Sequence, residues 1–292
     1  MAAMGEPVPY PDPRCPGTAA ASEHAVLDRF TVAIVCLGAV SLGPYWNHAN
    51  LAAPYWRLYL NRQDGAGLRV GDRRLPLRAG RLYLIPAEVS YATQPAEGVD
   101  HIFVHFDLPG LPTALVRAVF PAPIALNNES ARTARLSAIG DNLAGGMVPD
   151  LALLLRSRTV VDDCLAEVVG ALPPDQRLRL SVGALHGGRL GQVLARIEVD
   201  PCAPHDLASL ACAAGISPDH LARLFRRHLG TTPARHIGDR RLALAARALA
   251  YGEDDIETVA HAHGFANRFG FTRAFSRRFG CGPAAWRNRG GA

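Results

Sequence analysis

Arginines recur at matched positions in the last third of this chain, and arginine is the side chain best suited to bind phosphate and guanine. The segment RLFRRHLGTTPA, which starts at Arg223, returns as RAFSRRFGCGPA, which starts at Arg273. Six positions repeat in register, namely Arg223/Arg273, Phe225/Phe275, Arg227/Arg277, Gly230/Gly280, Pro233/Pro283 and Ala234/Ala284. A repeat of this size is typical of a duplicated supersecondary unit. An arginine-rich face beside an apolar one would let each copy lie against the phosphate walls of a DNA groove.

Two helices must position the arginines of the first copy. The segment DLASLACAAG predicts a short helix that ends at Gly215. Ser217 can cap a second helix that has Pro218 at its first position. At 100° per residue, the packed side of this second helix carries Leu221, Leu224, Phe225 and His228. The opposite side, which we expect to face DNA bases, carries Asp219, Ala222, Arg223 and Arg226.

The second copy follows the same plan. The segment IETVAHAHGF runs to Gly264, and Asn267 can cap the next helix. Its packed stripe is Phe271, Ala274, Phe275 and Phe279, and its outward face is Arg268, Phe269, Thr272, Arg273 and Ser276. An exposed phenylalanine at such a place suits contact with a thymine methyl or a base edge. We expect DNA phosphates to be bound by Arg227, Arg277 and Arg278.

A strongly helical segment from Pro233 to Leu249 joins the two copies. At ~1.5 Å per residue it spans roughly 24 Å, which with flanking turns can hold two reading helices near the ~34 Å that separates successive major-groove faces. Charged helix faces are commonly only solvated, and helix-turn-helix geometry also occurs as plain packing. Two arginine-bearing copies in register favour DNA reading.

Composition agrees with a globular protein in which one part meets a polyanion. Hydrophobic residues make up 49% of the 292 residues and charged residues 20%. Residues 181–292 hold 15 arginines against 9 acids, or +6, whereas residues 1–180 hold 16 against 17, or −1. The positive field therefore belongs to the C-terminal part.

The six cysteines form no CxxC pair and no zinc-ligand spacing. The longest apolar run is far below the ~20 residues that span a bilayer, and the N-terminus lacks a secretory pattern. We expect reduced thiols, a cytoplasmic location, and neither a cofactor nor a membrane partner.

Four parts are predicted along the chain. Residues 1–22, with scattered prolines and glycines, predict a flexible arm. Residues 23–112 contain short strands between turns and predict a sandwich or barrel. Residues 113–185 predict helices that end in a linker, PPDQRLRLSVGALHGG. Residues 186–292 are helical throughout. The predicted class is a multidomain α+β protein.

Three segments in order, AGISPDHLARLFRRHLGTTPARHI, RRLALAARAL and IETVAHAHGFANRFGFTRAFSRRFGCGPAAWR, resemble the DNA-binding domain of the AraC/XylS family of bacterial transcription regulators. The resemblance covers about residues 190–289. It implies two helix-turn-helix subdomains joined by a helix, with reading helices in adjacent major grooves. It gives base-facing roles to Asp219, Ala222, Arg223, Arg226, Arg268, Phe269, Thr272 and Arg273. Asp219 is acidic and Ala222 has no hydrogen-bonding group, so neither is a favourable side chain for the major groove. Base selection by the first of the two DNA-reading helices should therefore depend mainly on Arg223.

The stretch WRLYLNRQDGAGLRVGDRRLPLRAGRLYLIPAEVSYAT, followed by HIFVHFDL, resembles the cupin-like effector-binding barrel of many family members, over about residues 30–108. This resemblance implies a small-molecule sensor, often for sugars, with a homodimer contact in the helices of residues 113–172. By position it places Arg62, His101 and Phe103 at the ligand, and strand alternation adds His105. Trp46, Trp56 and Tyr91 suit the walls of a sugar site. The family also implies RNA polymerase as a partner and activation as the sign of control.

Other interpretations stay open. Trp46 and Trp56 can be core residues, Arg57 and Arg62 exposed arginines, and the histidines ordinary barrel residues. A metal-dependent cupin enzyme would need an HxH pair, a following Glu and a later His. The first strand region has no HxH pair, and Tyr91 stands where the later His would be, so we expect no enzyme. A third alternative is a regulator that answers to a protein partner or to its own abundance.

Overall fold

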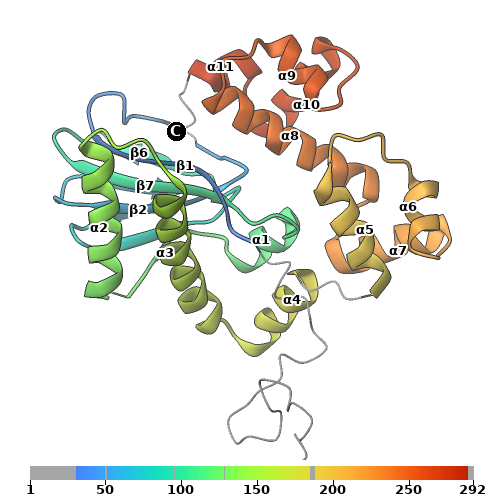
Figure 1. Ribbon diagram of the computed structural model, residues 1–292, viewed down its shortest axis with the longest axis horizontal. Coiled ribbons are helices and arrows are strands. Elements are labelled where there is room, and N and C mark those ends of the chain that lie inside the picture. Colours follow the sequence, from blue (N-terminus) through green and yellow to red (C-terminus); the bar gives the residue numbers. More distant parts are fainter. Residues whose placement is uncertain (1–30, 50, 95, 128, 185–187, 289–292) are drawn as a thin grey trace, which may run out of the picture.

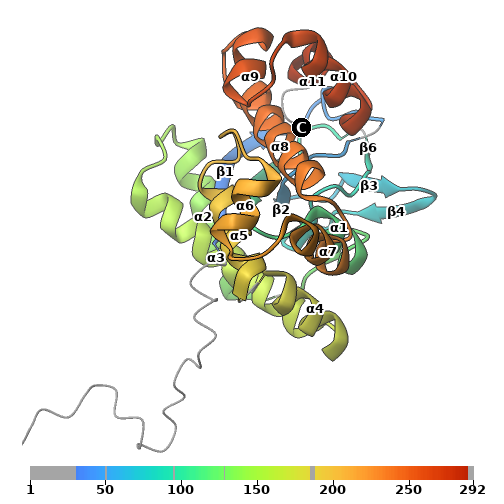
Figure 2. The ribbon, with the colours of Figure 1, turned by 90° about the vertical axis from the view of Figure 1, so that its right-hand side faces the viewer.

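The computed structural model describes residues 31–49, 51–94, 96–127, 129–184 and 188–288. The predicted arm of residues 1–22 lies outside this range. A β-rich N-terminal part and a helical C-terminal part lie side by side (Figure 1). Turning the molecule shows α8 (Pro233–Tyr251) along the boundary between them (Figure 2). The predicted α+β class is confirmed at this level.

Two antiparallel sheets form the N-terminal part. The five-stranded sheet has the order β1 (Ala33–Ser41), β7 (Asp100–Asp107), β2 (Trp56–Asn61), β5 (Leu82–Ile85) and β8 (Ile124–Ala125). The three-stranded sheet has the order β4 (Arg73–Pro76), β3 (Gly67–Val70) and β6 (Ala92–Gln94). Within the described residues no continuous ladder closes these sheets into a barrel. The prediction of residues 113–185 as helices and a linker missed strand β8. Its two residues pair with β5 and extend the five-stranded sheet.

Alternation along the central strands creates one apolar face. Trp56, Leu58 and Leu60 of β2 lie beside Ile102, Val104 and Phe106 of β7, and all six are buried. Helices α2 (Ser130–Ala144) and α3 (Leu151–Gly170) cover this face. The approach of α2 is close, because a Cβ on Gly140 would lie 2.4 Å from Cδ1 of Ile102.

Two further helices connect the parts, namely α1 (Thr113–Val119) and α4 (Pro174–Ala184). The predicted linker from Pro173 is therefore mostly helix, since Pro174 and Asp175 are favourable in a first helical turn. Helix α4 contacts both α1 and α7 (Pro218–Leu229).

The C-terminal part contains two small cores that share α8. Helices α5 (Gly188–Val199), α6 (Leu207–Ala213) and α7 enclose the first core, and Ile237 of α8 completes it. Helices α9 (Ile256–Ala262), α10 (Arg268–Phe279) and α11 (Pro283–Asn288) enclose the second with Leu242, Ala245, Ala246 and Leu249 of α8. No helix in the described part of the chain is both long enough and apolar enough to cross a membrane.

Candidate nucleic-acid interface

Helix α7 is built as predicted for the first reader. The Ser217 hydroxyl accepts a hydrogen bond from the His220 amide at 3.2 Å, and Pro218 occupies the first turn. Gly230 ends the helix at φ 65, a conformation that favours glycine. Leu221 and Phe225 are fully buried. Capping and packing thus fix which side of the helix remains free.

The free side of α7 carries the predicted base-facing residues. Asp219, Arg223 and Arg226 are exposed, and Ala222 is half-buried. One prediction is wrong, because His228 is exposed and Leu229 is buried in its place, one helical turn after Phe225.

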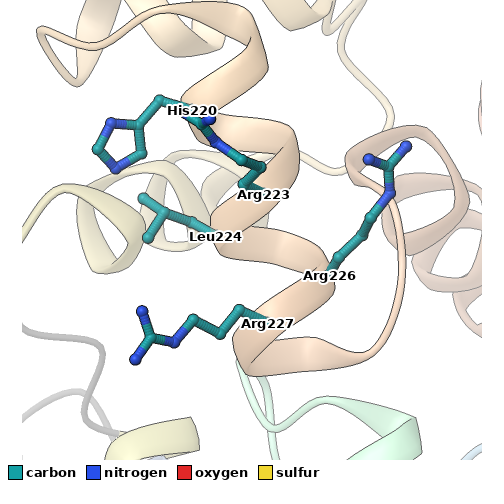
Figure 3. Close-up of a pocket in the computed structure, with 5 residues that line it drawn as sticks. All are labelled: His220, Arg223, Leu224, Arg226 and Arg227. Atoms are coloured by element: carbon teal, nitrogen blue, oxygen red, sulfur yellow. The ribbon is translucent and has the colours of Figure 1, made fainter.

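A shallow hollow of about 500 Å³ lies along α7, lined by His220, Arg223, Leu224, Arg226 and Arg227. Figure 3 shows His220, Leu224 and Arg227 extending from one side of the helix and Arg226 from the other. Three guanidinium groups along one helix suit a polyanion.

Helix α10 repeats this construction. The Asn267 side chain accepts from the Gly270 amide at 2.8 Å, and Gly280 ends the helix at φ 73. Phe271 and Phe275 are fully buried. The outward positions comprise the exposed Arg268, Phe269 and Arg273 and the half-buried Thr272 and Ser276. Phe269 is 83% exposed. A large apolar ring is normally buried, so this exposure suits a ring that contacts a binding partner.

Of the three predicted phosphate contacts, Arg227 and Arg277 are exposed. Arg278 is different. Its guanidinium forms two hydrogen bonds with the carboxylate of Glu88, in the loop between β5 and β6, and its side chain is only 14% exposed. In this arrangement Arg278 therefore cannot contact a phosphate. Successive residues of a helix point about 100° apart, so Arg278 points toward the N-terminal part while the preceding Arg277 is exposed.

Known proteins match the chain chiefly over these helices. A family model described as a helix-turn-helix domain matches residues 210–289. The HTH-type transcriptional regulator GlxA of Rhizobium meliloti (strain 1021) is 38% identical over 100 residues, which are 34% of this chain and 31% of GlxA. The probable transcription factor PqrA of Proteus vulgaris is 34% identical over 82 residues, which are 28% of this chain and 67% of PqrA. The chain belongs to the AraC family of transcription regulators.

This AraC-family chain also resembles a solved structure over both of its parts. The crystal structure of ToxT from Vibrio cholerae O395 matches with a TM-score of 0.52 and 12% identity, covering 90% of this chain and 98% of ToxT. At this identity the likeness concerns the fold alone. It supports a β-rich N-terminal part joined to the helix-turn-helix part. The family is one of regulators and not of enzymes.

Five of the seven predicted effector residues lie together on the other face of the five-stranded sheet, which we call the inner face. They are Trp46, Tyr91, His101, Phe103 and His105. The ring centroids of Trp46 and His101 lie 5.0 Å apart, and those of Phe103 and His105 lie 4.8 Å apart. Tyr91 reaches the group through its hydroxyl, 3.0 Å from that of Tyr59.

The structure places Trp56 and Arg62 elsewhere. Trp56 lies on the apolar face, where its ring stacks on Phe106 at 6.1 Å. Strand alternation explains this, because Trp56 and Tyr59 are an odd number of residues apart. Arg62 follows the last residue of β2, and its guanidinium pairs with Asp141 of α2. Neither side chain joins the inner face.

Strand β2 supplies inner-face residues that the predicted effector set did not include, and Arg57, open to interpretation as an exposed arginine, is buried. Arg57, Tyr59 and Asn61 stand in register with His105, Phe103 and His101 of β7. The Arg57 guanidinium is fully buried, 4.9 Å from the Tyr55 ring and 5.4 Å from the Tyr91 ring. Because alternate residues of a strand share a face, the sequence could have predicted that these three lie on one side of β2. It could not have predicted that they are buried, because that depends on residues from other segments that cover them.

Several polar side chains on the inner face are buried, namely Arg57, Asn61, His101 and His105. Asn61 Oδ1 lies 2.7 Å from Nδ1 of His101. Burial lowers the pKa of His101 to about 3, and burial with nearby Arg57 and His101 holds the pKa of His105 well below its usual value. Both rings are therefore neutral at pH 7. The buried donors Trp46 Nε1 and Asn61 Nδ2 have no hydrogen-bond partner among the described residues, so a ligand oxygen could accept from them. Among the same residues no three His, Cys, Asp or Glu side chains are grouped as a metal ion would need.

Proposed function

We propose that this protein is a sequence-specific DNA-binding transcription regulator that reads two adjacent major-groove segments with α7 and α10. The observation that carries the proposal is the matched pair of reading helices. Both have a side-chain cap, a left-handed glycine end and two buried apolar residues one turn apart. Both present an exposed arginine at the same place, Arg223 and Arg273. The excess of arginine over acid in residues 181–292 supports a polyanionic partner.

Selection of bound duplexes from a random DNA library tests this function. We expect the full chain to enrich a sequence with two separated elements. Arg223→Ala should relax base preference in one element and Arg273→Ala in the other, each with a loss of about 1–3 kcal/mol on the selected site. Failure to enrich any sequence, or an equal loss on random DNA, would contradict direct base reading.

We further propose that the inner face binds a small-molecule effector. A sugar is the first candidate, since the rings of Trp46 and Tyr91 and the amide of Asn61 combine apolar walls with hydrogen-bonding groups. A carboxylic acid is the second candidate. It is favoured by the buried charge of Arg57, and a ToxT structure contains (E)-4-(8-methylnaphthalen-1-yl)but-3-enoic acid.

Thermal unfolding with a panel of neutral sugars and of carboxylic acids separates these candidates. A ligand that binds the native state must raise the unfolding midpoint. Asn61→Ala should reduce the shift caused by either class, whereas Arg57→Gln should reduce chiefly the shift caused by an acid. If no compound in either class raises the midpoint, control by a protein partner becomes the better explanation.

We also propose a homodimer that forms through α3. Leu151 and Leu155, one turn apart at the start of this helix, are 72% and 54% exposed, and Val148 in the segment before it is 82% exposed. Leu151→Asp should convert a dimer to a monomer in analytical ultracentrifugation, and a wild-type monomer would contradict the proposal. Activation through RNA polymerase is the proposed sign of control, and transcription in vitro from a template carrying the selected site tests it.

A further inference from the structure

The contact between Arg278 and Glu88 joins the second reading helix to the N-terminal part. Nη1 of Arg278 donates to Oε2 of Glu88 at 2.7 Å, and Nη2 donates to Oε1 at 2.5 Å. Nε of Arg278 lies 3.5 Å from Asp239 of α8. This two-pronged geometry is the one by which arginine binds a phosphate. The carboxylate of Glu88 thus holds Arg278 as a DNA phosphate would.

The surroundings of this ion pair are dry. The side chain of Glu88 is 5% exposed. Nearby, Ala53 and Tyr55 of the N-terminal part are buried with Leu249, Phe271 and Phe275 in the second core. Charges largely out of water are screened little by salt, so the attraction between these two groups depends little on ionic strength.

The backbone at Glu88 adopts the left-handed conformation, which is strained for a residue other than glycine. Glu88 has φ 68, and it is the one non-glycine residue with positive φ in the described part of the chain. Its amide donates to the Ala53 carbonyl at 2.8 Å, which holds the turn in place. Arg117 of α1 adds a second cation 3.6 Å from the same carboxylate. Strain of this kind persists only where the surroundings enforce it, and it tends to mark switches and clamps.

We propose that Glu88 competes with the DNA backbone for Arg278, so that the second reader binds a phosphate through Arg278 only after this contact opens. The inference rests on the proposed DNA-binding function. Exposed Arg227 and Arg277 need no such release. The position of α7 that corresponds to Arg278 is His228, which is also exposed. The proposed restraint acts on α10.

Salt dependence of DNA binding tests the proposal, with a random-sequence duplex as the probe because phosphate contacts do not need the operator. One added phosphate contact steepens the plot of log K against log salt by about 0.9. We expect Glu88→Gln to steepen the slope by up to that amount and to raise affinity at low salt. Glu88→Gly should do the same, and it accepts the positive φ without strain. Thermal unfolding verifies that both variants are folded.

Two controls separate release of Arg278 from the gain of one net positive charge. Glu97→Gln changes the charge equally at an exposed acid of the same part, and it should leave the slope unchanged. In an Arg278→Ala background, Glu88→Gln should have no effect on the slope. If the wild type binds the duplex but neither Glu88 variant changes the slope, the competition is excluded while DNA binding stands. If no variant binds DNA, the proposed function fails together with it.

Discussion

Nδ1 of His105 lies 2.7 Å from the hydroxyl of Tyr251, which joins the inner face of the sheet to the last turn of α8. The same hydroxyl donates to the hydroxyl of Tyr55 at 3.1 Å, so Nδ1 of His105 is the donor toward Tyr251. A ligand that moves His105 would therefore act on the helix that separates the two readers.

Removal of that hydroxyl should destabilise the protein. Tyr251→Phe deletes the one hydroxyl that forms hydrogen bonds with both His105 and Tyr55, and these two partner residues are buried. We expect the free energy of unfolding in urea to fall by about 1–3 kcal/mol. Tyr45→Phe is the control, because the exposed Tyr45 hydroxyl donates to the nearby Ser41 carbonyl, and its change should stay within about 0.5 kcal/mol. Equal effects of the two substitutions would show that the contact between the parts contributes nothing.

Stability should fall as the pH drops below the ordinary histidine pKa. The unfolded chain binds a proton at His101 near pH 6.5, whereas the folded chain resists it down to a pKa of about 3. The contribution of His101 to the free energy of unfolding is thus fully present above about pH 6.5 and is lost as the pH falls toward 3. The loss is at most about 1.4 kcal/mol per pH unit. Urea unfolding at several pH values should show a shallower dependence for His101→Gln than for the wild type. Parallel curves would contradict a neutral buried His101.

Loss of a phosphate contact should weaken binding to all DNA sequences alike. Arg227→Ala and Arg277→Ala should each flatten the salt slope by about 0.9. Arg73→Ala removes the same charge from an exposed position in β4 and should leave the slope nearly unchanged. A loss confined to the selected sequence would instead assign these arginines to bases.

Phe269 should matter for binding and not for folding. Its ring is 83% exposed, so Phe269→Ala should change the free energy of unfolding by less than about 0.5 kcal/mol. On the selected duplex we expect a loss of about 1–3 kcal/mol, concentrated at a thymine position. Unchanged binding would leave this exposed ring without a role in base reading.

Close packing of α2 on the sheet should make Gly140→Ala destabilising, by about 1–3 kcal/mol, since the new Cβ would overlap Cδ1 of Ile102. Ile102→Val removes that atom and should rescue part of the loss. Gly170→Ala is the matched control, because nothing lies within 4 Å of the corresponding Cβ. A neutral Gly140→Ala would indicate that the helix can shift.

The construction of α7 and α10 was predictable from the sequence because its signals are local. Ser217, Asn267, Gly230 and Gly280 act within one turn of chain, and the buried residues follow the helical period. The helix over the predicted linker was missed because prolines at its start suggest a break as much as a first turn.

The inner face was only partly predictable. Its members come from separate strands and loops, so the pairing of β2 with β7 had to be known before Arg57 and Asn61 could be set beside the two histidines. The burial of Arg278 was not predictable at all, since Glu88 is 190 residues away in sequence and nothing local pairs them.

Helix α8 contributes side chains to both small cores, with Ile237 near one end and Leu249 near the other. Movement of either subdomain along α8 would disrupt its own core. If α7 and α10 read DNA as proposed, we therefore expect a fixed spacing between the two recognised elements. Insertion of about five base pairs between the two recognised elements, roughly half a turn of B-DNA, would move one element to the opposite side of the double helix. Regulatory sites for this protein should therefore vary in base composition between the elements but not in the number of base pairs there.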